Sequence, residues 1–191
     1  MTRLTRRLLL GGGAGALAAG AAKADPAAVA RTAWDFSFPD IDGGSLDLAK
    51  FRGRVLLVVN TASFCGYTYQ YKALEAVDRK LEPRGLTVIG VPSGDFFQES
   101  RTNEKVKNFC ETRFDIGFPL AAISQVRGAA AAPFYRWVRV ERDWQPTWNF
   151  NKVLIGRDGR IRGTWRATAE PDGPELTRAI EAALAEPAPQ I

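Results

Sequence analysis

Two cysteines, Cys65 and Cys110, are the only thiols in this chain of 191 residues, which contains no histidine. The absence of histidine excludes serine–histidine and cysteine–histidine catalysis, as well as metal and haem sites built on histidine. The two cysteines lie far apart in the sequence, and Thr68 stands where a C-x-x-C motif would place its second cysteine. These residues indicate thiol chemistry at single cysteines, and we expect neither a metal nor a cofactor.

Cys65 lies at the junction of two expected elements. Val55–Val59 is an uninterrupted, β-branched apolar run, which is typical of a strand buried on both faces of a sheet. Asn60–Gly66 predicts a turn. From Tyr67 onward, apolar residues recur at helical spacing, at Tyr71, Leu74, Val77 and Leu81. Free backbone N–H groups and the helix dipole favour a thiolate at such a junction, although Cys65 as a small buried apolar residue is the alternative.

The elements around this junction predict an α/β protein with a thioredoxin-like fold, in which a central mixed sheet is flanked by helices. Further strands are expected at Leu86–Val91, Lys152–Ile155 and Arg160–Trp165, and helices from Asn103 to about Phe114, from Pro133, and from Pro174 or Glu175. Asn103 is the expected cap of its helix. The first two strands should be parallel because a helix connects them, and the last two should form a hairpin. We expect one domain over residues 25–191.

The first 24 residues have the composition of an export signal. They contain the twin-arginine segment Thr5–Leu10, an uncharged stretch from Leu8 to Ala22 and the small-x-small sequence Ala22-Lys23-Ala24. We expect a twin-arginine signal peptide, export to the periplasm and no stable membrane insertion after cleavage; an uncleaved amphipathic anchor is the alternative. Without the four leader cations the formal net charge falls from +5 to +1, so the basic pI does not indicate nucleic-acid binding.

Four separated motifs, in order, resemble the glutathione peroxidase family. They are Asn60–Thr68 with Gln70-Tyr71, then Asp95–Glu99, Asn108–Cys110 and Trp148–Phe150. The resemblance covers roughly Phe36 to Leu184. It implies a hydroperoxide-reducing tetrad of Cys65, Gln98, Trp148 and Asn149, with Cys65 as the peroxidatic residue. The loop to Gln98 is one residue shorter than the commonest form of the family.

The residue types of this tetrad suit a reactive thiolate. A cysteine with a pKa of about 8.5 is only about 3% thiolate at pH 7, and about 90% thiolate requires roughly 3.4 kcal/mol of stabilisation. A helix N-terminus supplies about 0.3–1 kcal/mol, whereas each hydrogen bond to a charged group contributes roughly 1.5–3 kcal/mol. Gln98 and Asn149 offer amide donors and Trp148 an indole donor. Taken singly, each could instead be an ordinary loop, turn or core residue.

The resemblance also implies a role for Cys110, because family members that use thioredoxin carry a cysteine in this position. Cys110 would resolve the sulfenic acid on Cys65 by forming a disulfide. Its helical face, shared with Val106, Phe109 and Phe114, predicts a buried starting position, so the helix would have to open locally. A core cysteine without a redox role is the alternative.

The reductant and the oligomeric state follow from the same resemblance. A thioredoxin-like protein or glutathione is the expected reductant. The short segment between Pro133 and Trp148 lacks the insertion of tetrameric family members, which implies a monomer with an exposed Cys65 site. Two other functions fit a single reactive cysteine, namely a periplasmic thiol–disulfide exchange protein and a peroxide-sensing thiol relay.

Overall fold

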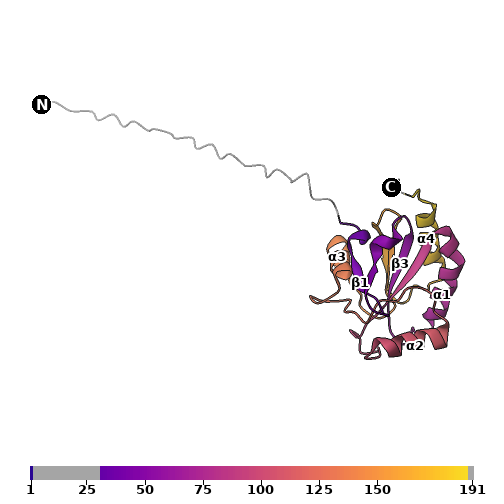
Figure 1. The fold of residues 1–191 in the computed structure, drawn as a ribbon. Coiled ribbons are helices and arrows are strands. Elements are labelled where there is room, and N and C mark those ends of the chain that lie inside the picture. The colour runs from indigo at the N-terminus through magenta and orange to yellow at the C-terminus, as the bar shows by residue number, and fades with distance from the viewer. Residues whose placement is uncertain (2–30, 189–191) are drawn as a thin grey trace. The chain divides into compact units, whose positions relative to one another are not determined.

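The computed structural model describes residues 31–188 and Met1 (Figure 1). Residues 31–188 belong to one compact unit. The predicted signal peptide at residues 1–24 lies outside the described residues, apart from Met1, so export stays a prediction.

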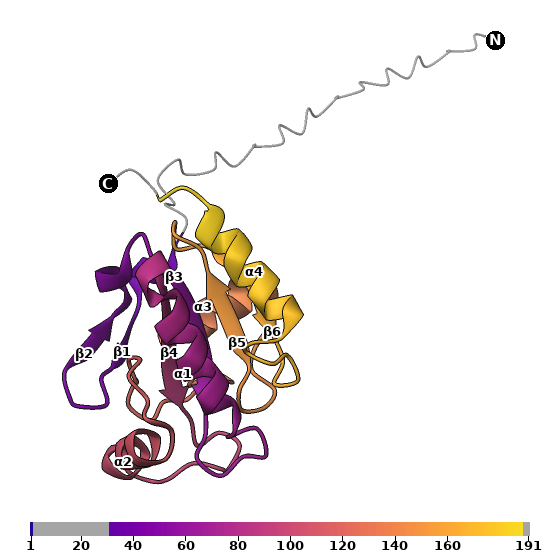
Figure 2. The same ribbon diagram turned by 90° about the vertical axis from the view of Figure 1, so that its right-hand side faces the viewer.

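A four-stranded mixed sheet forms the centre of the fold, with the strand order β4-β3-β5-β6 (Figure 2). Its strands are β3 (Val55–Thr61), β4 (Leu86–Pro92), β5 (Lys152–Ile155) and β6 (Ile161–Trp165). β3 pairs in parallel with β4 and antiparallel with β5, which pairs antiparallel with β6. A separate hairpin joins β1 (Ser37–Pro39) to β2 (Ser45–Asp47). The parallel first pair and the closing hairpin confirm the expected thioredoxin-like α/β architecture.

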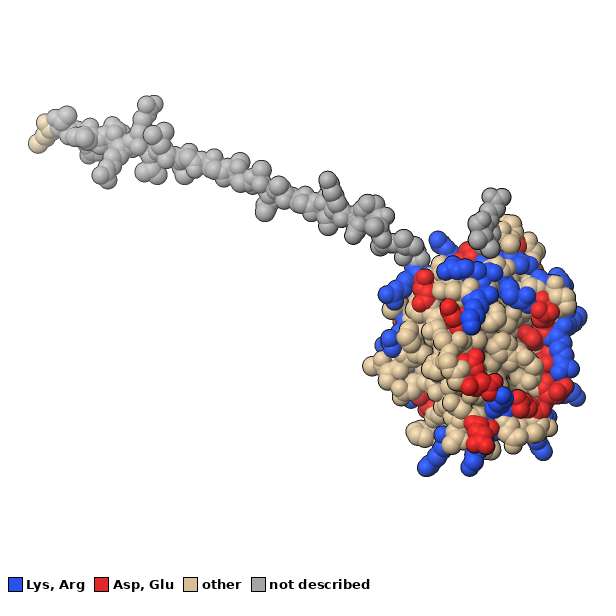
Figure 3. Space-filling model, in the orientation of Figure 1, with Lys and Arg blue, Asp and Glu red and all other residues tan. Residues whose placement is uncertain are grey.

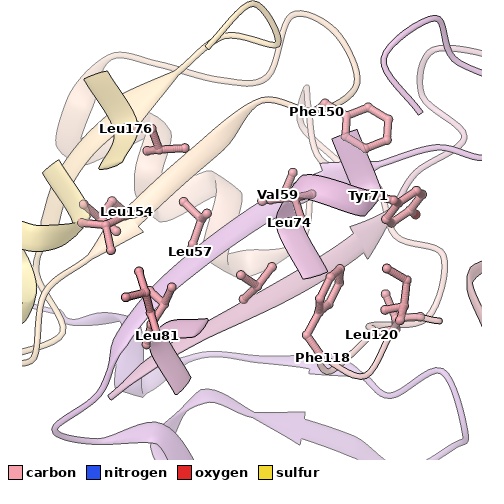
Figure 4. Packing of buried hydrophobic residues seen from close by; sticks show 14 of the residues in the cluster. Leu57, Val59, Tyr71, Leu74, Leu81, Phe118, Leu120, Phe150, Leu154 and Leu176 are labelled. Atoms are coloured by element: carbon pink, nitrogen blue, oxygen red, sulfur yellow. The ribbon is translucent and has the colours of Figure 1, made fainter. Parts of the chain in front are cut away.

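Helices cover both faces of this sheet (Figures 1 and 2). α1 (Gln70–Leu81) and α4 (Pro174–Ala185) lie on one face, α3 (Pro133–Arg142) lies on the other, and α2 (Asn103–Phe114) lies beyond one end of the sheet. Alternate residues of β3 enter two cores, because successive side chains of a strand point to opposite faces. Leu57 and Val59 pack in the core beside α1, which Figure 4 shows, whereas Leu56 and Val58 pack in the core beside α3. This two-sided burial explains the uninterrupted apolar run of β3.

The start of α1 differs from the expectation. The helix begins at Gln70 and not at Tyr67. The preceding residues form tight turns, in which the N–H of Thr68 donates to the carbonyl of Cys65 at 3.0 Å and the N–H of Gln70 donates to that of Tyr67 at 2.9 Å. Cys65 therefore lies five residues before α1, in a turn of its own.

The cap of α2 also differs. Thr102 is the N-cap, and its hydroxyl accepts the N–H of Lys105 at 3.4 Å. The side chain of Asn103 instead accepts the N–H of Ile123 at 2.9 Å. The expected cap was wrong by one residue because Asn103 is engaged by the loop that follows α2.

Candidate active site

The Cys65 turn is held by its own hydrogen bonds. The N–H of Cys65 donates to the hydroxyl of Thr68 at 3.0 Å, and that hydroxyl donates to the carbonyl of Ala62 at 2.9 Å. The N–H of Tyr67 donates to Sγ of Cys65 at 3.4 Å. The turn therefore fixes the sulfur and supplies it with a backbone donor.

The expectation of an exposed Cys65 was wrong. The residue is only 8% exposed, although its neighbour Phe64 is 64% exposed. The turn points the Phe64 side chain outward and Cys65 inward, where the cysteine joins the apolar core beside α1. A peroxide would therefore have to enter a largely covered site.

Gln98 and Asn149 meet beside this turn. Nδ2 of Asn149, which is fully buried, donates to Oε1 of Gln98 at 3.0 Å. The carbonyl of Gln98 accepts the N–H of Phe64 at 3.0 Å, so the loop carrying Gln98 is tied directly to the Cys65 turn. The shortened loop thus brings Gln98 within hydrogen-bond distance of Asn149 and of the Cys65 turn. Because Oε1 of Gln98 is the acceptor, its amide N–H groups are left to serve as donors.

Trp148 is held mainly through its backbone. Its carbonyl accepts Nδ2 of Asn60 at 2.9 Å and Nδ2 of Asn151 at 2.6 Å. Trp148 is 42% exposed, and its ring centroid lies 5.5 Å from that of Phe96. Asn60 and Asn151 are supporting residues that sequence reasoning missed, although Asn60 opens the first motif.

A buried lysine holds the start of α1 next to the site. Nζ of Lys152, at the start of β5, donates to Oε1 of Gln70 at 2.6 Å and to the carbonyl of Ala169 at 2.6 Å. Burial lowers the pKa of its amine to about 8. Lys152 thereby connects the first residue of α1 with the strand that follows Asn149. Sequence reasoning missed this role, for which a lysine inside an apolar strand was the available signal.

Cys110 lies in a different environment, fully buried in the middle of α2. Burial raises the pKa of its thiol to about 11. Both cysteines are free thiols and belong to the same apolar core. Phe64 and Phe109, which precede the two cysteines, lie with ring centroids 6.3 Å apart, so the Cys65 turn packs against α2. The predicted burial of Cys110 is confirmed.

Exposed aromatic side chains surround the site. Of the five large apolar side chains that are exposed within residues 31–188, four belong to the segments that form it: Phe64, Tyr69, Phe97 and Trp148. Phe97 is 97% exposed and has a φ of +59°, a backbone conformation that bulky residues rarely adopt. A hollow of about 420 Å³ adjoins this loop, between Phe97, Arg101 and Ile123.

Other kinds of site receive no support from the described part of the chain. Within it, no three histidine, cysteine or acidic side chains gather where they could hold a metal ion, and no helix is long and apolar enough to cross a membrane. On the face shown in Figure 3, acidic side chains lie among the basic ones.

Comparison with known proteins gives a consistent result. The family model described as glutathione peroxidase matches residues 33–139. Hydroperoxy fatty acid reductase gpx1 of Synechocystis is 36% identical, over 81% of this chain and 96% of its own. Thioredoxin/glutathione peroxidase BtuE of Escherichia coli is 33% identical, over 76% and 93%. The crystal structure of Trgpx in apo form superposes with a TM-score of 0.67 and 35% identity, over 84% and 100%. The chain therefore belongs to the glutathione peroxidase family and is a peroxidase of that type.

Proposed function

We propose that this protein reduces hydrogen peroxide and organic hydroperoxides with Cys65 as the peroxidatic residue, and that Gln98, Trp148 and Asn149 complete its catalytic site. The observation that carries the assignment is the hydrogen bond between Asn149 and Gln98, on a loop tied to the Cys65 turn. It supports a cluster of amide donors beside a thiol whose sulfur already accepts a backbone N–H. Such donors stabilise negative charge on sulfur and on the leaving oxygen.

The first step of the proposed cycle is a nucleophilic displacement. The Cys65 thiolate attacks one peroxide oxygen, and the O–O bond breaks. The departing hydroxide or alkoxide takes up a proton and leaves as water or an alcohol, while Cys65 becomes a sulfenic acid. The peroxide gains the two electrons that the sulfur loses, so this step needs no metal or organic cofactor.

The second step is the proposed formation of a disulfide between Cys65 and Cys110. The Cys110 thiol condenses with the sulfenic acid and water leaves. The packing of Phe64 against Phe109 supports this pairing, because it places the Cys65 turn on the helix that carries Cys110. Cys110 starts fully buried, so α2 must open locally before the sulfurs can bond.

A thioredoxin-like protein or glutathione would then supply two electrons to restore both thiols. The name of the Escherichia coli relative, thioredoxin/glutathione peroxidase, supports both candidates. We also propose that the protein acts as a monomer and in the periplasm. The length of the segment between Pro133 and Trp148 supports the first proposal, and the twin-arginine leader supports the second.

The exposed aromatic residues support organic hydroperoxides as substrates. Phe64, Phe97 and Trp148 offer apolar contact area that hydrogen peroxide cannot use. The Synechocystis relative is named a hydroperoxy fatty acid reductase, which agrees with an apolar substrate. The non-reacting part of such a substrate would lie against these rings while its peroxide group reaches Cys65.

One experiment tests the whole cycle. Reduced protein is mixed with one equivalent of hydrogen peroxide or cumene hydroperoxide, quenched at intervals, alkylated and weighed by intact-mass spectrometry. The proposal expects rapid sulfenic acid at Cys65, followed by loss of water and a Cys65–Cys110 disulfide. Oxidation no faster than that of a free thiol would contradict the peroxidase assignment and favour thiol–disulfide exchange. Fast oxidation without turnover with any reductant would favour a sensing relay.

A further inference from the structure

Gln70 belongs to the first sequence motif, yet the proposed catalytic site leaves it without a role. It is the first residue of α1, and it is fully buried. A buried amide is costly unless its oxygen and its nitrogen both find partners. Here both do: Oε1 accepts Nζ of Lys152 at 2.6 Å, and Nε2 donates to the carbonyl of Ala167 at 2.7 Å. Gln70 is therefore held at both ends of its amide.

Lys152 is the only lysine or arginine that is buried within residues 31–188. Besides Gln70, its Nζ donates to the carbonyl of Ala169 at 2.6 Å and to that of Ala167 at 3.5 Å. Both alanines belong to the loop between β6 and α4. A buried ammonium depends on such oxygens, because their loss would leave its charge without solvation. Lys152 thus fixes the side chain of Gln70 against this loop.

The two side chains lie on the same face of the sheet as Cys65. Lys152 stands opposite Val59 in the antiparallel pair of β5 and β3, and opposite residues of such a pair point to the same face. Val59 and Cys65 belong to the core beside α1. The side chain of Lys152 therefore reaches from β5 into the region where α1 begins.

The backbone of Gln70 is linked to the donor on the Cys65 sulfur. Its N–H donates to the carbonyl of Tyr67 at 2.9 Å, and the N–H of Tyr67 donates to Sγ of Cys65 at 3.4 Å. Tyr67 precedes α1, so helical hydrogen bonds do not fix its N–H. Together with the contact to Lys152, these hydrogen bonds form a continuous series from the buried ammonium to the sulfur.

We infer that Gln70, anchored by Lys152, is a positioning residue that holds the N–H of Tyr67 against the Cys65 sulfur. This role rests on the proposed function, because it concerns the thiol that meets the peroxide. A hydrogen bond to a charged sulfur weakens when its distance or angle changes. If the start of α1 were free to shift, the donor would move, and less of Cys65 would be thiolate at a given pH. Gln70 acts only through Tyr67 and touches no reacting atom.

Gln70→Leu and Lys152→Met test this role through the Cys65 thiolate. The rate of alkylation by iodoacetamide is measured between pH 5 and 9.5 by mass spectrometry of the peptide that carries Cys65. Each variant should move the midpoint of this profile upward by about one pH unit, and below the midpoint it should slow oxidation by hydrogen peroxide roughly tenfold. The double variant should match the single variants, because both act through one contact.

Asp78→Ala is the matched control for general loosening of α1. Asp78 is a buried residue of the same helix, and its carboxylate accepts the N–H of Val88 in β4 at 2.7 Å. Its loss should lower stability but leave the alkylation midpoint within about 0.2 pH unit of the wild type. No shift in Gln70→Leu, or an equal shift in Asp78→Ala, would overturn the positioning role.

Amide exchange in the reduced wild type needs no variant to fold. If Gln70 holds Tyr67 in place, the N–H groups of these two residues should be protected from exchange by the same opening, at least about tenfold relative to a free peptide. NMR measures both rates. A protected Gln70 amide beside an unprotected Tyr67 amide would overturn the positioning role.

Alkylation uses no peroxide, so the positioning role and the proposed function can fail separately. Slow oxidation of wild-type Cys65 by peroxides, with an alkylation midpoint that still depends on Gln70, would overturn the proposed function. Fast oxidation of the wild type, with the same midpoint in Gln70→Leu and Lys152→Met as in the wild type, would overturn the positioning role alone.

Discussion

The two cysteines of this protein share one apolar core yet occupy opposite chemical environments. Cys65 lies in a turn whose backbone N–H groups are not consumed by a helix, so Tyr67 donates to its sulfur. Cys110 lies in the middle of α2, where the helix uses its own N–H groups and burial raises the pKa of the thiol to about 11. The local backbone, more than the amount of burial, decides which thiol meets donors, because both residues are buried.

This difference suits two successive roles. The sulfur that meets the peroxide needs donors that stabilise an anion and a leaving group. The sulfur that arrives second benefits from staying protonated and covered until the first has reacted, since a thiolate held in reserve would itself be oxidised.

Replacing each cysteine by serine should give the largest difference. Cys65→Ser should lower peroxidase activity at least about 10³-fold, because it removes the nucleophile. Cys110→Ser should leave the first oxidation unchanged but lower steady-state turnover with a thioredoxin-like reductant at least about tenfold. Stopped-flow peroxide consumption and coupled turnover measure the two effects. Full turnover of Cys110→Ser would show that the second cysteine has no role in the cycle.

Removing the amide donors should have the next largest effect. Gln98→Ala and Asn149→Ala should each lower the rate of Cys65 oxidation roughly 10–10²-fold, as expected for a lost donor to a developing anion. The two side chains bond to each other, so the double variant should lose less than the product of the single effects. Second-order rates with hydrogen peroxide provide the measurement.

Gln145→Ala offers a matched control for these amide variants. Its side-chain oxygen accepts the N–H of Gly128 at 3.2 Å, and Gln145 lies in the loop that also carries Trp148 and Asn149 but has no proposed contact with the peroxide. The oxidation rate should stay within twofold of the wild type. An equal loss in Gln145→Ala and Gln98→Ala would mean that the amide variants act through general loosening of loops.

Local sequence pattern was enough to predict the sheet but not the turn before α1. Val55–Val59 is buried on both faces and the last two strands form a hairpin, and both patterns extend over adjacent residues. The start of α1 depends on which partner Thr68 takes, and its hydroxyl binds the N–H of Cys65 and the carbonyl of Ala62 before the helix begins. Helical spacing of apolar residues carries no information on that choice.

The candidate site was predictable as a set of residues but not as an arrangement. The motifs named Gln98 and Asn149, whereas their mutual hydrogen bond arises from loops 51 positions apart. The N–H of Phe64, whose side chain is exposed while Cys65 is buried, donates to the carbonyl of Gln98 from the same distant loop. Lys152 escaped notice because a charged residue in a strand is usually exposed, and only tertiary packing buries it.

Replacing Lys152 measures how much a buried charge contributes to the stability of the region around Cys65. Lys152→Met removes donors from the side chain of Gln70 and the carbonyl of Ala169, so we expect a loss of about 1–3 kcal/mol in unfolding free energy at pH 7. The folded pKa of about 8 lies below the unfolded value of 10.5. Between these values the unfolded chain binds more protons, so the stability of the wild type relative to Lys152→Met should rise with pH.

The size of this rise in relative stability follows from the shift in the pKa of Lys152. It should approach about 3 kcal/mol between pH 8 and 10.5, as an upper limit. Urea unfolding of both proteins at pH 7, 8, 9 and 10 measures it, and comparison with the variant cancels the titration of other groups. A stability difference that stays constant, or that shrinks as pH rises, would mean that the folded state keeps Lys152 fully charged.

Phe97 should give the smallest effect and separates substrate contact from backbone strain. Its exposed ring and φ of +59° are both unfavourable, which suggests that the ring serves a contact. Phe97→Ala and Phe97→Gly both remove the ring, so both should lower kcat/KM for cumene hydroperoxide about three- to tenfold while leaving hydrogen peroxide within twofold. Only glycine relieves the strain, so Phe97→Gly should be about 1 kcal/mol more stable than Phe97→Ala. As a control, Val140→Ala at an exposed apolar residue of α3 should change the rate with neither peroxide. Equal losses for both peroxides in the Phe97 variants would mean that the ring positions Gln98 instead of binding substrate.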